Sequence, residues 1–332
     1  MVPRLTTAVY STSATFGHEM SAPHRARSRP SLVLLGLLLT PAASRADDAP
    51  RPRILGISHV ALRASQMEAS LRFYRDFLGL AAAPAGPSDP RAEWLVRINE
   101  GQHLALQPGL VPSEDRLDHV AFQVADLPAA RRALAARGVA CVERAPDACT
   151  FRDTEGHHIE LVPHPGDASP PSPSAGEASP VSSRILHAGL LVGGLEESRR
   201  FYEGLGFHET WRGSRSGTEL SWTNMRVPDG DDYVEFMLYA EKPAPDARGT
   251  QHHVCLEVPD AEAARAVLLG RVESVGYTRP LEIRIGTNRR RQMNLYDPDG
   301  TRVELMEPRT VDGKPVPSST APPPRRASLS TR

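Results

Sequence analysis

Histidine and glutamate residues recur in the same order along two stretches of this chain. Each histidine lies in a short alternating stretch, and each set ends on a glutamate in a matching frame. The two sets are His59, His119 and Glu160, and then His187, Glu235, His253 and Glu304. Imidazole and carboxylate groups that a fold brings together are the ligands that first-row divalent metals prefer. The pattern therefore predicts metal centres.

The elements that must bring these residues together are strands. The histidines belong to ISHVALRA (57–64), DHVAFQVAD (118–126), ILHAGLLV (185–192) and HHVCLEVPD (252–260), and the closing glutamates to GHHIELVP (156–163) and TRVELMEP (301–308). Because side chains alternate between the faces of a strand, this periodicity places Glu235 at an inward position. The corresponding residue of the first set is Ala105, with His103 and Gln107 on the same face.

Internal repetition predicts the architecture. Residues 57–80 and 185–207 follow one plan, a strand with a histidine, a turn, and an amphipathic helix that ends at glycine. A shorter version recurs at 118–139 and 252–270. We expect a capping box from Ser65 and Glu68, and helix N-caps from Asp126 and Asp260. Several strands follow each helix, which predicts an α+β fold of four βαβββ modules, paired so that curled mixed sheets enclose a cleft.

Composition places the chain among soluble globular proteins. Its 332 residues are enough for two domains, which we expect at 54–163 and 185–308. A Pro/Ser-rich segment, 164–184, is predicted to be a linker, and 309–332 a disordered tail. The net charge of −1 and the hydrophobic content of 40% give no electrostatic reason to expect a nucleic-acid partner.

The first 46 residues are predicted to be an export signal, with Met20 as a possible true start. Arginines precede the apolar run SLVLLGLLL (31–39), and small residues follow it before a plausible cleavage site after Ala46. The apolar run is short for a membrane span, so we expect an exported protein without a membrane anchor after cleavage. The alternative is a hydrophobic tail that is not cleaved.

The three cysteines do not make a disulfide scaffold. Cys141 and Cys149 flank a possible hairpin turn, so one bridge between them is conceivable in an oxidising compartment. Cys255 lies inside an alternating stretch and is predicted to be a small core residue.

The repeated pattern of strand histidine, FY-containing helix ending at glycine, and closing EL dipeptide resembles the vicinal oxygen chelate superfamily. That superfamily includes glyoxalase I, extradiol dioxygenases and bleomycin resistance proteins, and the resemblance covers roughly 54–163 and 185–308. It implies that the second set fills all four glyoxalase I-type ligand positions, whereas the first set has Ala105 at the fourth. The implied cofactor is a divalent metal ion: iron, manganese, zinc or nickel.

Together with the predicted export signal, the resemblance implies an exported metal-dependent enzyme that acts on a small substrate with vicinal oxygens. Isomerase, lyase or oxygenase chemistry would proceed through a metal-stabilised, enolate-like anion, with Glu304 or Glu235 as the base. Ring cleavage of a catechol is disfavoured, because Asn294 stands where extradiol enzymes have a tyrosine. The alternatives are a non-catalytic module of the bleomycin-resistance type, which sequesters a ligand, and a structural protein.

A basic run before the last strand offers a possible substrate clamp. Arg284, Arg289 and Arg291 could hold a carboxylate or phosphate group, although a solvated cluster of loop charges explains them as well. Trp211 and Trp222 could line the pocket or pack in the core. We expect a monomer or a homodimer, because four modules in one chain could complete both clefts.

Overall fold

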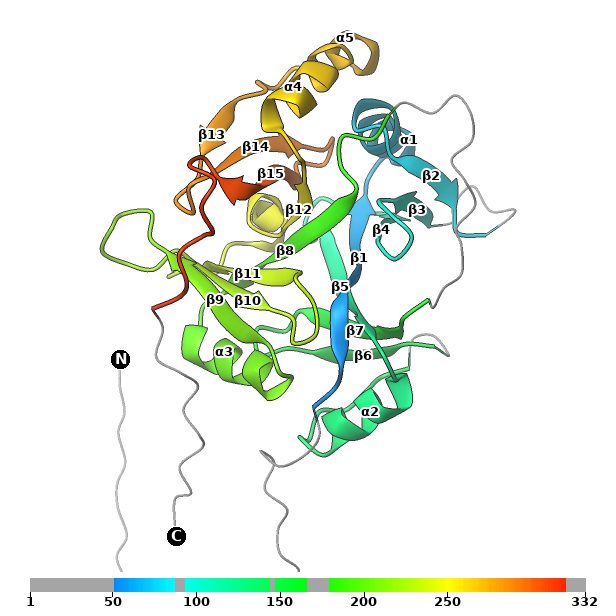
Figure 1. Ribbon diagram of the computed structural model, residues 1–332. Helices are drawn as coiled ribbons and strands as arrows, with labels where there is room; N and C mark the ends of the chain where they lie inside the picture. The colour runs from blue at the N-terminus through cyan, green and yellow to red at the C-terminus, as the bar shows by residue number, and fades with distance from the viewer. Residues whose placement is uncertain (1–50, 87–92, 144–146, 166–178, 321–332) are drawn as a thin grey trace, which may run out of the picture. The chain divides into compact units, whose positions relative to one another are not determined.

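The computed structural model describes residues 51–86, 93–143, 147–165 and 179–320, which form two mixed sheets (Figure 1). The first sheet has seven strands, in the spatial order β2 (Ala81–Pro84), β3 (Trp94–Arg97), β4 (His103–Pro108), β1 (Ile54–Ala64), β5 (Leu117–Val124), β7 (His158–Pro163) and β6 (Cys149–Arg152). The second has eight, in the order β13 (Ile283–Ile285), β14 (Arg290–Tyr296), β15 (Arg302–Thr310), β12 (His253–Glu257), β8 (Arg184–Val192), β11 (Tyr233–Leu238), β10 (Trp222–Arg226) and β9 (His208–Gly213).

Short helices connect the strands. They are α1 (Met67–Leu71), which continues into the π-helical turn η2 (Arg72–Phe77), α2 (Leu127–Ala135), α3 (Leu195–Gly204), the 3-10 helix η3 (Pro245–Thr250), α4 (Ala261–Leu269) and α5 (Val272–Val275). Among the described residues, no helix is long and apolar enough to span a membrane.

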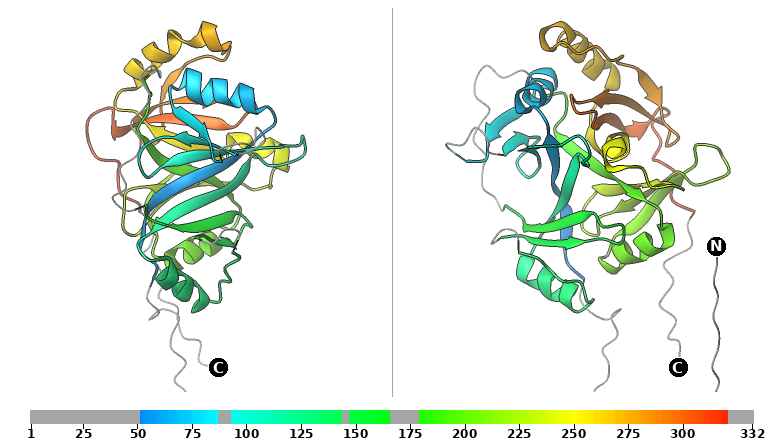
Figure 2. Two further views of the ribbon diagram at one scale, coloured as in Figure 1. Left: turned by 90° about the vertical axis from the view of Figure 1, so that its right-hand side faces the viewer. Right: turned by 180° about the vertical axis from the view of Figure 1, so that it is seen from behind.

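The two sheets share one pairing scheme. In the first sheet, β1 and β5 lie side by side and antiparallel (Figure 2), with β4 parallel to β1 and β7 parallel to β5. In the second sheet, β8 and β12 are the antiparallel pair, with β11 parallel to β8 and β15 parallel to β12. The expected α+β fold of paired modules in curled mixed sheets is confirmed. In the second module, one strand is reduced to a single bridge between Val142 and Thr150.

One hydrophobic core runs through both sheets. Phe122 contacts Phe207 edge-on at 5.3 Å between ring centroids, and Phe77 stacks on Tyr277 at 4.6 Å. The core residues include β-branched and aromatic side chains from the inward faces of the strands, whose burial stabilises the fold.

Two equivalent hydrogen bonds join the sheets. The hydroxyl of Tyr74, in η2, donates to Asp297 at 3.0 Å, and that of Tyr202, in α3, donates to Asp153 at 3.1 Å. Asp297 lies in the turn before β15 of the second sheet, and Asp153 lies in the turn before β7 of the first sheet, so each bond crosses from one sheet to the other. The repeat seen in the sequence is therefore also a repeat of contacts between the sheets.

Local predictions have mixed outcomes. Asp126 and Asp260 cap α2 and α4 through their carboxylates, as predicted. The capping box of Ser65 and Glu68 is wrong, because α1 has Gln66 at its N-cap and no side-chain capping bond. The hydroxyl and N–H of Ser65 instead donate to Asp299 of the second sheet.

The segments outside the sheets are described in part. The predicted signal, residues 1–46, lies outside the described residues, as do residues 166–178 of the predicted linker and 321–332 of the predicted tail. Val181, near the end of the linker, is buried and donates its N–H to Leu78. The strand β15 extends two residues past the expected boundary at 308, to Thr310, whose side chain is buried.

Candidate metal centre

Four adjacent strands of the second sheet bring the second set together. The sheet order β15, β12, β8, β11 places Glu304, His253, His187 and Glu235 on neighbouring strands. The Nε2 atoms of His187 and His253 lie 3.0 Å apart, and carboxylate oxygens of both glutamates lie 3.4–3.7 Å from them. One ligand atom from each of the four residues lies within 4.8 Å of all the others.

The position of the His253 imidazole depends on Gly189. This residue pairs with both Glu235 and His253 across the sheet. A Cβ atom at this position would overlap the imidazole of His253. Glycine therefore leaves room for the ring between the flanking strands.

Two of the four side chains, His253 and Glu304, have pKa values shifted toward the protonation states that bind metals. Burial lowers the pKa of His253 well below 6.5, and the positive charge of Arg302 acts in the same direction. Burial would raise the pKa of Glu304, but its hydrogen bond with His187 and the charge of Arg302 outweigh burial, and the pKa is lowered. A neutral imidazole beside an ionised carboxylate is a ligand pair, since ligands must be deprotonated to bind.

The donor atoms fit a divalent cation. Nδ1 of His253 faces away from the other ligands, 2.7 Å from the carbonyl oxygen of Gln251 and 2.8 Å from Nη2 of Arg302, so Nε2 is the nitrogen that faces the other donor atoms. Two nitrogens 3.0 Å apart, each at a typical bond length of about 2.1 Å, subtend about 90° at a metal. Two imidazoles and two carboxylates in this arrangement suit zinc, iron, manganese or nickel.

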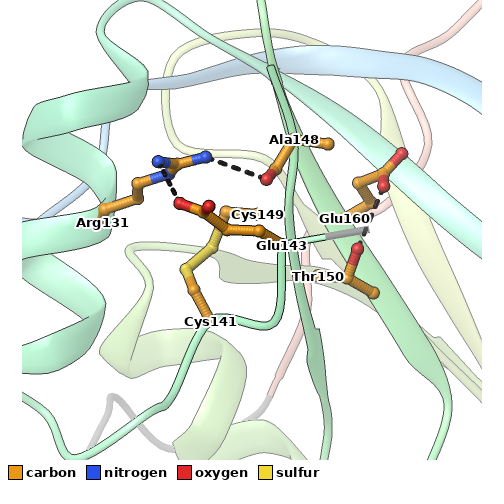
Figure 3. The surroundings of a disulfide bond; sticks show 7 residues. All are labelled: Arg131, Cys141, Glu143, Ala148, Cys149, Thr150 and Glu160. Atoms are coloured by element: carbon orange, nitrogen blue, oxygen red, sulfur yellow. Dashed lines mark hydrogen bonds and ion pairs between the residues drawn. A yellow bond between two sulfur atoms is a disulfide. The ribbon is translucent and has the colours of Figure 1, made fainter. Parts of the chain in front are cut away.

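The first set converges in the same way in the first sheet. The Nε2 atoms of His59 and His119 are 2.9 Å apart, and Oε2 of Glu160 lies 3.6 and 3.5 Å from them. Thr150 donates its hydroxyl to the other oxygen of Glu160 at 3.0 Å (Figure 3). Nδ1 of His119 contacts Asp118 at 2.8 Å, a carboxylate contact that orients a metal-binding imidazole.

The two sets differ at one position. His103 stacks on His59 at 4.6 Å between ring centroids, as Tyr233 stacks on His187 at 4.6 Å. Two residues further along its strand, β4 has Ala105. The first set is therefore a two-histidine, one-carboxylate set among the described residues.

Cavities reach the second set. A cavity of about 60 Å³ is lined by both carboxylates, Glu235 and Glu304, together with Trp211, Trp222 and Arg302. A larger cavity of about 610 Å³ shares Trp211 with it and is also lined by Tyr233, Asn224 and Arg290. The two tryptophans thus line the space beside the carboxylates, one of the two roles that the sequence left open.

The arginines expected to contact a substrate lie elsewhere. None of the three lines the 60 Å³ cavity, and each is paired with an acid: Arg284 with Glu282 at 2.6 Å, Arg289 with Asp312 at 3.6 Å, and Arg291 with Glu307 at 3.4 Å. Their side chains are 70%, 56% and 44% exposed. Their exposure and ion pairs fit a solvated charge cluster, although Arg284 also lines a cavity of about 220 Å³ together with Asn294.

Other polar residues lie beside the two carboxylates. Arg302 has Nη2 2.8 Å from Nδ1 of His253 and lines the smaller cavity. Asn224 pairs across the sheet with Glu235, and Asn294 with Glu304. The Oδ1 atoms of both asparagines are buried without a hydrogen-bond partner in the described part of the chain. Cross-strand pairing would have identified Asn224, had the hairpin register been readable from the sequence.

Comparison with known proteins agrees with this fold. A family model, the Glyoxalase/Bleomycin resistance protein/Dioxygenase superfamily, matches residues 56–167 and 184–305. A search of the curated proteins found no match.

Solved structures with a similar fold include two dioxygenases. The 2,3-dioxygenase LapB from Pseudomonas sp. KL28 is 19% identical, with a TM-score of 0.57 over 81% of this chain and 98% of that chain. Homoprotocatechuate 2,3-dioxygenase from Brevibacterium fuscum, in complex with 3,4-dihydroxyphenylacetate, is 17% identical, with a TM-score of 0.59 over 83% of this chain and 85% of that chain. The identities are low, so these structures show a common fold. Because the family model covers most of both repeated regions, the chain belongs to the Glyoxalase/Bleomycin resistance protein/Dioxygenase superfamily.

Proposed function

We propose that this chain is a divalent-metal-dependent enzyme whose second set transfers a proton on a small substrate with vicinal oxygens. The observation that carries the proposal is a full set of two imidazoles and two carboxylates, with both carboxylates lining a cavity. A divalent ion bound there would supply Lewis acidity to adjacent substrate oxygens. A protein that only sequesters a ligand has no need of four aligned donors.

Glu235 is the better candidate for the base. Its side chain is 10% exposed, against 3% for Glu304. Its cross-strand partner Asn224 lines the larger cavity, whereas Asn294, the cross-strand partner of Glu304, does not. A carboxylate that borders the cavity can accept a proton from a carbon next to a substrate carbonyl and return it to the neighbouring carbon.

The side chains around the carboxylates suit an oxygen-rich substrate. Asn224 and Asn294 carry amides whose N–H groups can donate to substrate oxygens, and Arg302 supplies a fixed positive charge. Trp211 and Trp222 line the cavity that Arg302 and both carboxylates line, and they offer apolar surface that limits water. This combination favours isomerase or lyase chemistry on a hydroxy-carbonyl compound.

Oxygenase chemistry is the second candidate, and the first set favours it. Two histidines and one carboxylate are the ligands of many non-haem Fe(II) oxygenases, and Ala105 supplies no fourth donor. Dependence of the reaction on oxygen and iron would distinguish it from proton transfer at the second set.

Export from the cytoplasm is also part of the proposal, and a disulfide supports it. Cys141 and Cys149 form a disulfide with Cα atoms 5.2 Å apart, a bond that persists in oxidising compartments (Figure 3). Cell fractionation, together with the mass of the purified chain, tests export. The expected result is extracytoplasmic protein that begins near residue 47.

The test of proton transfer is solvent exchange. The chain is loaded with manganese, nickel, zinc or iron in turn, and a panel of α-hydroxy ketones is followed by NMR in D₂O for deuterium uptake at carbon. We expect Glu235→Gln to retain the ion and to lose about 10²–10⁴-fold in exchange rate. Glu219→Gln, at an exposed glutamate, is the matched control. An unchanged rate in metal-loaded Glu235→Gln would remove Glu235 as the base.

A further inference from the structure

A third pair of buried histidines lies between the two sheets. His157 follows the turn before β7 of the first sheet, and His252 directly precedes β12 of the second. Their Nε2 atoms are 3.2 Å apart, and their side chains are only 9% and 2% exposed. Neither residue belongs to the two sets described above.

The geometry of this pair matches that of the candidate ligand pairs. The rings of His157 and His252 are edge-on, with centroids 5.1 Å apart and planes at 80°. The corresponding values are 5.0 Å and 87° in the second set, and 5.0 Å and 81° in the first. At a typical bond length of about 2.1 Å, nitrogens 3.2 Å apart subtend about 100° at a metal.

Both outer nitrogens face carboxylates. Nδ1 of His157 lies 2.8 Å from Asp153, and Nδ1 of His252 lies 2.9 Å from Asp115. Because a carboxylate only accepts hydrogen bonds, each Nδ1 carries a proton, and in the neutral form of each ring the Nε2 lone pair is directed at the other ring. Two lone pairs at this distance repel unless a positive charge lies between them. Carboxylate partners of this kind also orient metal-binding imidazoles.

The fold does not require the histidine pair. Asp297 occupies the equivalent turn of the second sheet and accepts the N–H of Thr301, as Asp153 accepts the N–H of His157. Thr301 therefore stands where the first sheet has His157. The residue before His119 is Asp118, at the position equivalent to His252. Only one of the two equivalent junctions thus carries two imidazoles.

A cavity gives access to the pair. It has a volume of about 340 Å³ and is lined by both histidines, with Asp118, Glu155 and His158 among its other walls. Water molecules would fill the remaining coordination positions of an ion held by two imidazoles, because no third donor residue lies within reach of both in the described part of the chain. A binding site that draws its ligands from both sheets would also stabilise their packing.

We propose that His157 and His252 bind a divalent transition-metal ion at the junction of the two sheets, with Asp153 and Asp115 as positioning residues. Imidazole ligands favour zinc, copper or nickel. The site is separate from the proposed catalytic set, since it uses no residue of that set.

Zinc binding to the full chain tests the proposal. Equilibrium dialysis against zinc measures the stoichiometry of the wild type and of the variants His157→Gln, His252→Gln and the double substitution. We expect each single variant to bind one equivalent less than the wild type, and the double variant to lose no more than either. His164→Gln, at an exposed histidine, should keep the wild-type stoichiometry. His187→Gln should lose a different equivalent, which separates this site from the catalytic set.

Equal stoichiometry in the wild type and in folded His157→Gln would overturn the proposal, and would mean that the two rings share a proton. If circular dichroism shows that His157→Gln is unfolded, Asp115→Asn replaces it, because that change keeps both imidazoles. We expect about 10–100-fold weaker zinc binding at one site in Asp115→Asn, the usual effect of removing such a partner. Unchanged zinc affinity at every site of that variant would also overturn the proposal.

Discussion

Ala105 in the first sheet stands at the position that Glu235 occupies in the second. Ala105 pairs with Ala61, two residues after His59, and Glu235 pairs with Gly189, two residues after His187. Both residues lie on strands parallel to the first histidine strand of their sheet. The same backbone therefore presents four donors in one sheet and three in the other.

A carboxylate at position 105 should complete the first set. In Ala105→Glu, the new side chain would extend from β4 toward His59 and add a negative donor, so we expect tighter binding of manganese or zinc, by at least tenfold. Competition with a chelating dye measures the affinity. Ala105→Gln is the matched control, with the same size and no charge. Equal affinities in the two variants would show that position 105 does not reach the ion.

The repeat and the strand periodicity predicted most of the site. Alternation places His187 and Glu304 on inward faces, and the register of β11 with β8 brings Glu235 to them. These relationships depend only on a period of two and on parallel or antiparallel pairing. They can be read from one sequence because each module repeats them.

Contacts between distant segments could not be predicted in the same way. Ser65 has a good local partner in the sequence, Glu68, but its hydroxyl donates to Asp299, 234 residues away. Arg289 has a positive φ of 65°, so the turn at this residue directs neighbouring side chains in a way that periodicity does not describe. Local patterns give the face of a strand, whereas loop conformation and partner sheet decide these contacts.

Removal of the disulfide should destabilise the first sheet. Cys141 and Cys149 are eight residues apart, and a closed loop of that size contributes roughly 2–3 kcal/mol to the free energy of unfolding. Cys149 also precedes Thr150, which holds Glu160. We expect Cys141→Ser/Cys149→Ser to unfold at lower urea concentration and to bind metal more weakly at the first set. Reductant should shift the wild type and leave the double variant unchanged.

The free energy of unfolding should fall as the pH rises from about 4 to about 6, because of Asp297. Burial raises its pKa from 3.8 to about 6, although bonds from Thr301 and Tyr74 favour the ionised form. The folded state then binds more protons than the unfolded state between these values, so the contribution is complete below about pH 4 and is lost as the pH rises through about 6. The difference corresponds to about 3 kcal/mol, since one pKa unit is worth about 1.4 kcal/mol.

Urea unfolding at several pH values checks this prediction. Other groups titrate in the same range, so the quantity to compare is the difference between the wild type and Asp297→Asn. From pH 4 to pH 6.5, the wild type should lose a few kcal/mol of unfolding free energy relative to Asp297→Asn. Asp231→Asn, at a carboxylate that is 79% exposed, should show no such trend. A pH-independent difference for Asp297→Asn would mean that its carboxyl has an ordinary pKa in the folded protein.

Removal of metal should lower the thermal stability through the second set. Glu235 and Glu304 are buried at 8% and 2% exposure, and each has a carboxylate oxygen within 3.4–3.7 Å of the two Nε2 atoms. Without a cation, the two carboxylates repel each other in a poorly solvated site. An ion at a thousand times its Kd adds about 4 kcal/mol to the free energy of unfolding. We therefore expect a chelator to lower the Tm and added manganese or zinc to restore it.

Two variants serve as controls. In Glu304→Gln, which relieves the repulsion and weakens metal binding, the chelator should change the Tm much less. His157→Gln should keep most of the wild-type response to the chelator. A chelator effect of equal size in the wild type and Glu304→Gln would place the stabilising ion elsewhere.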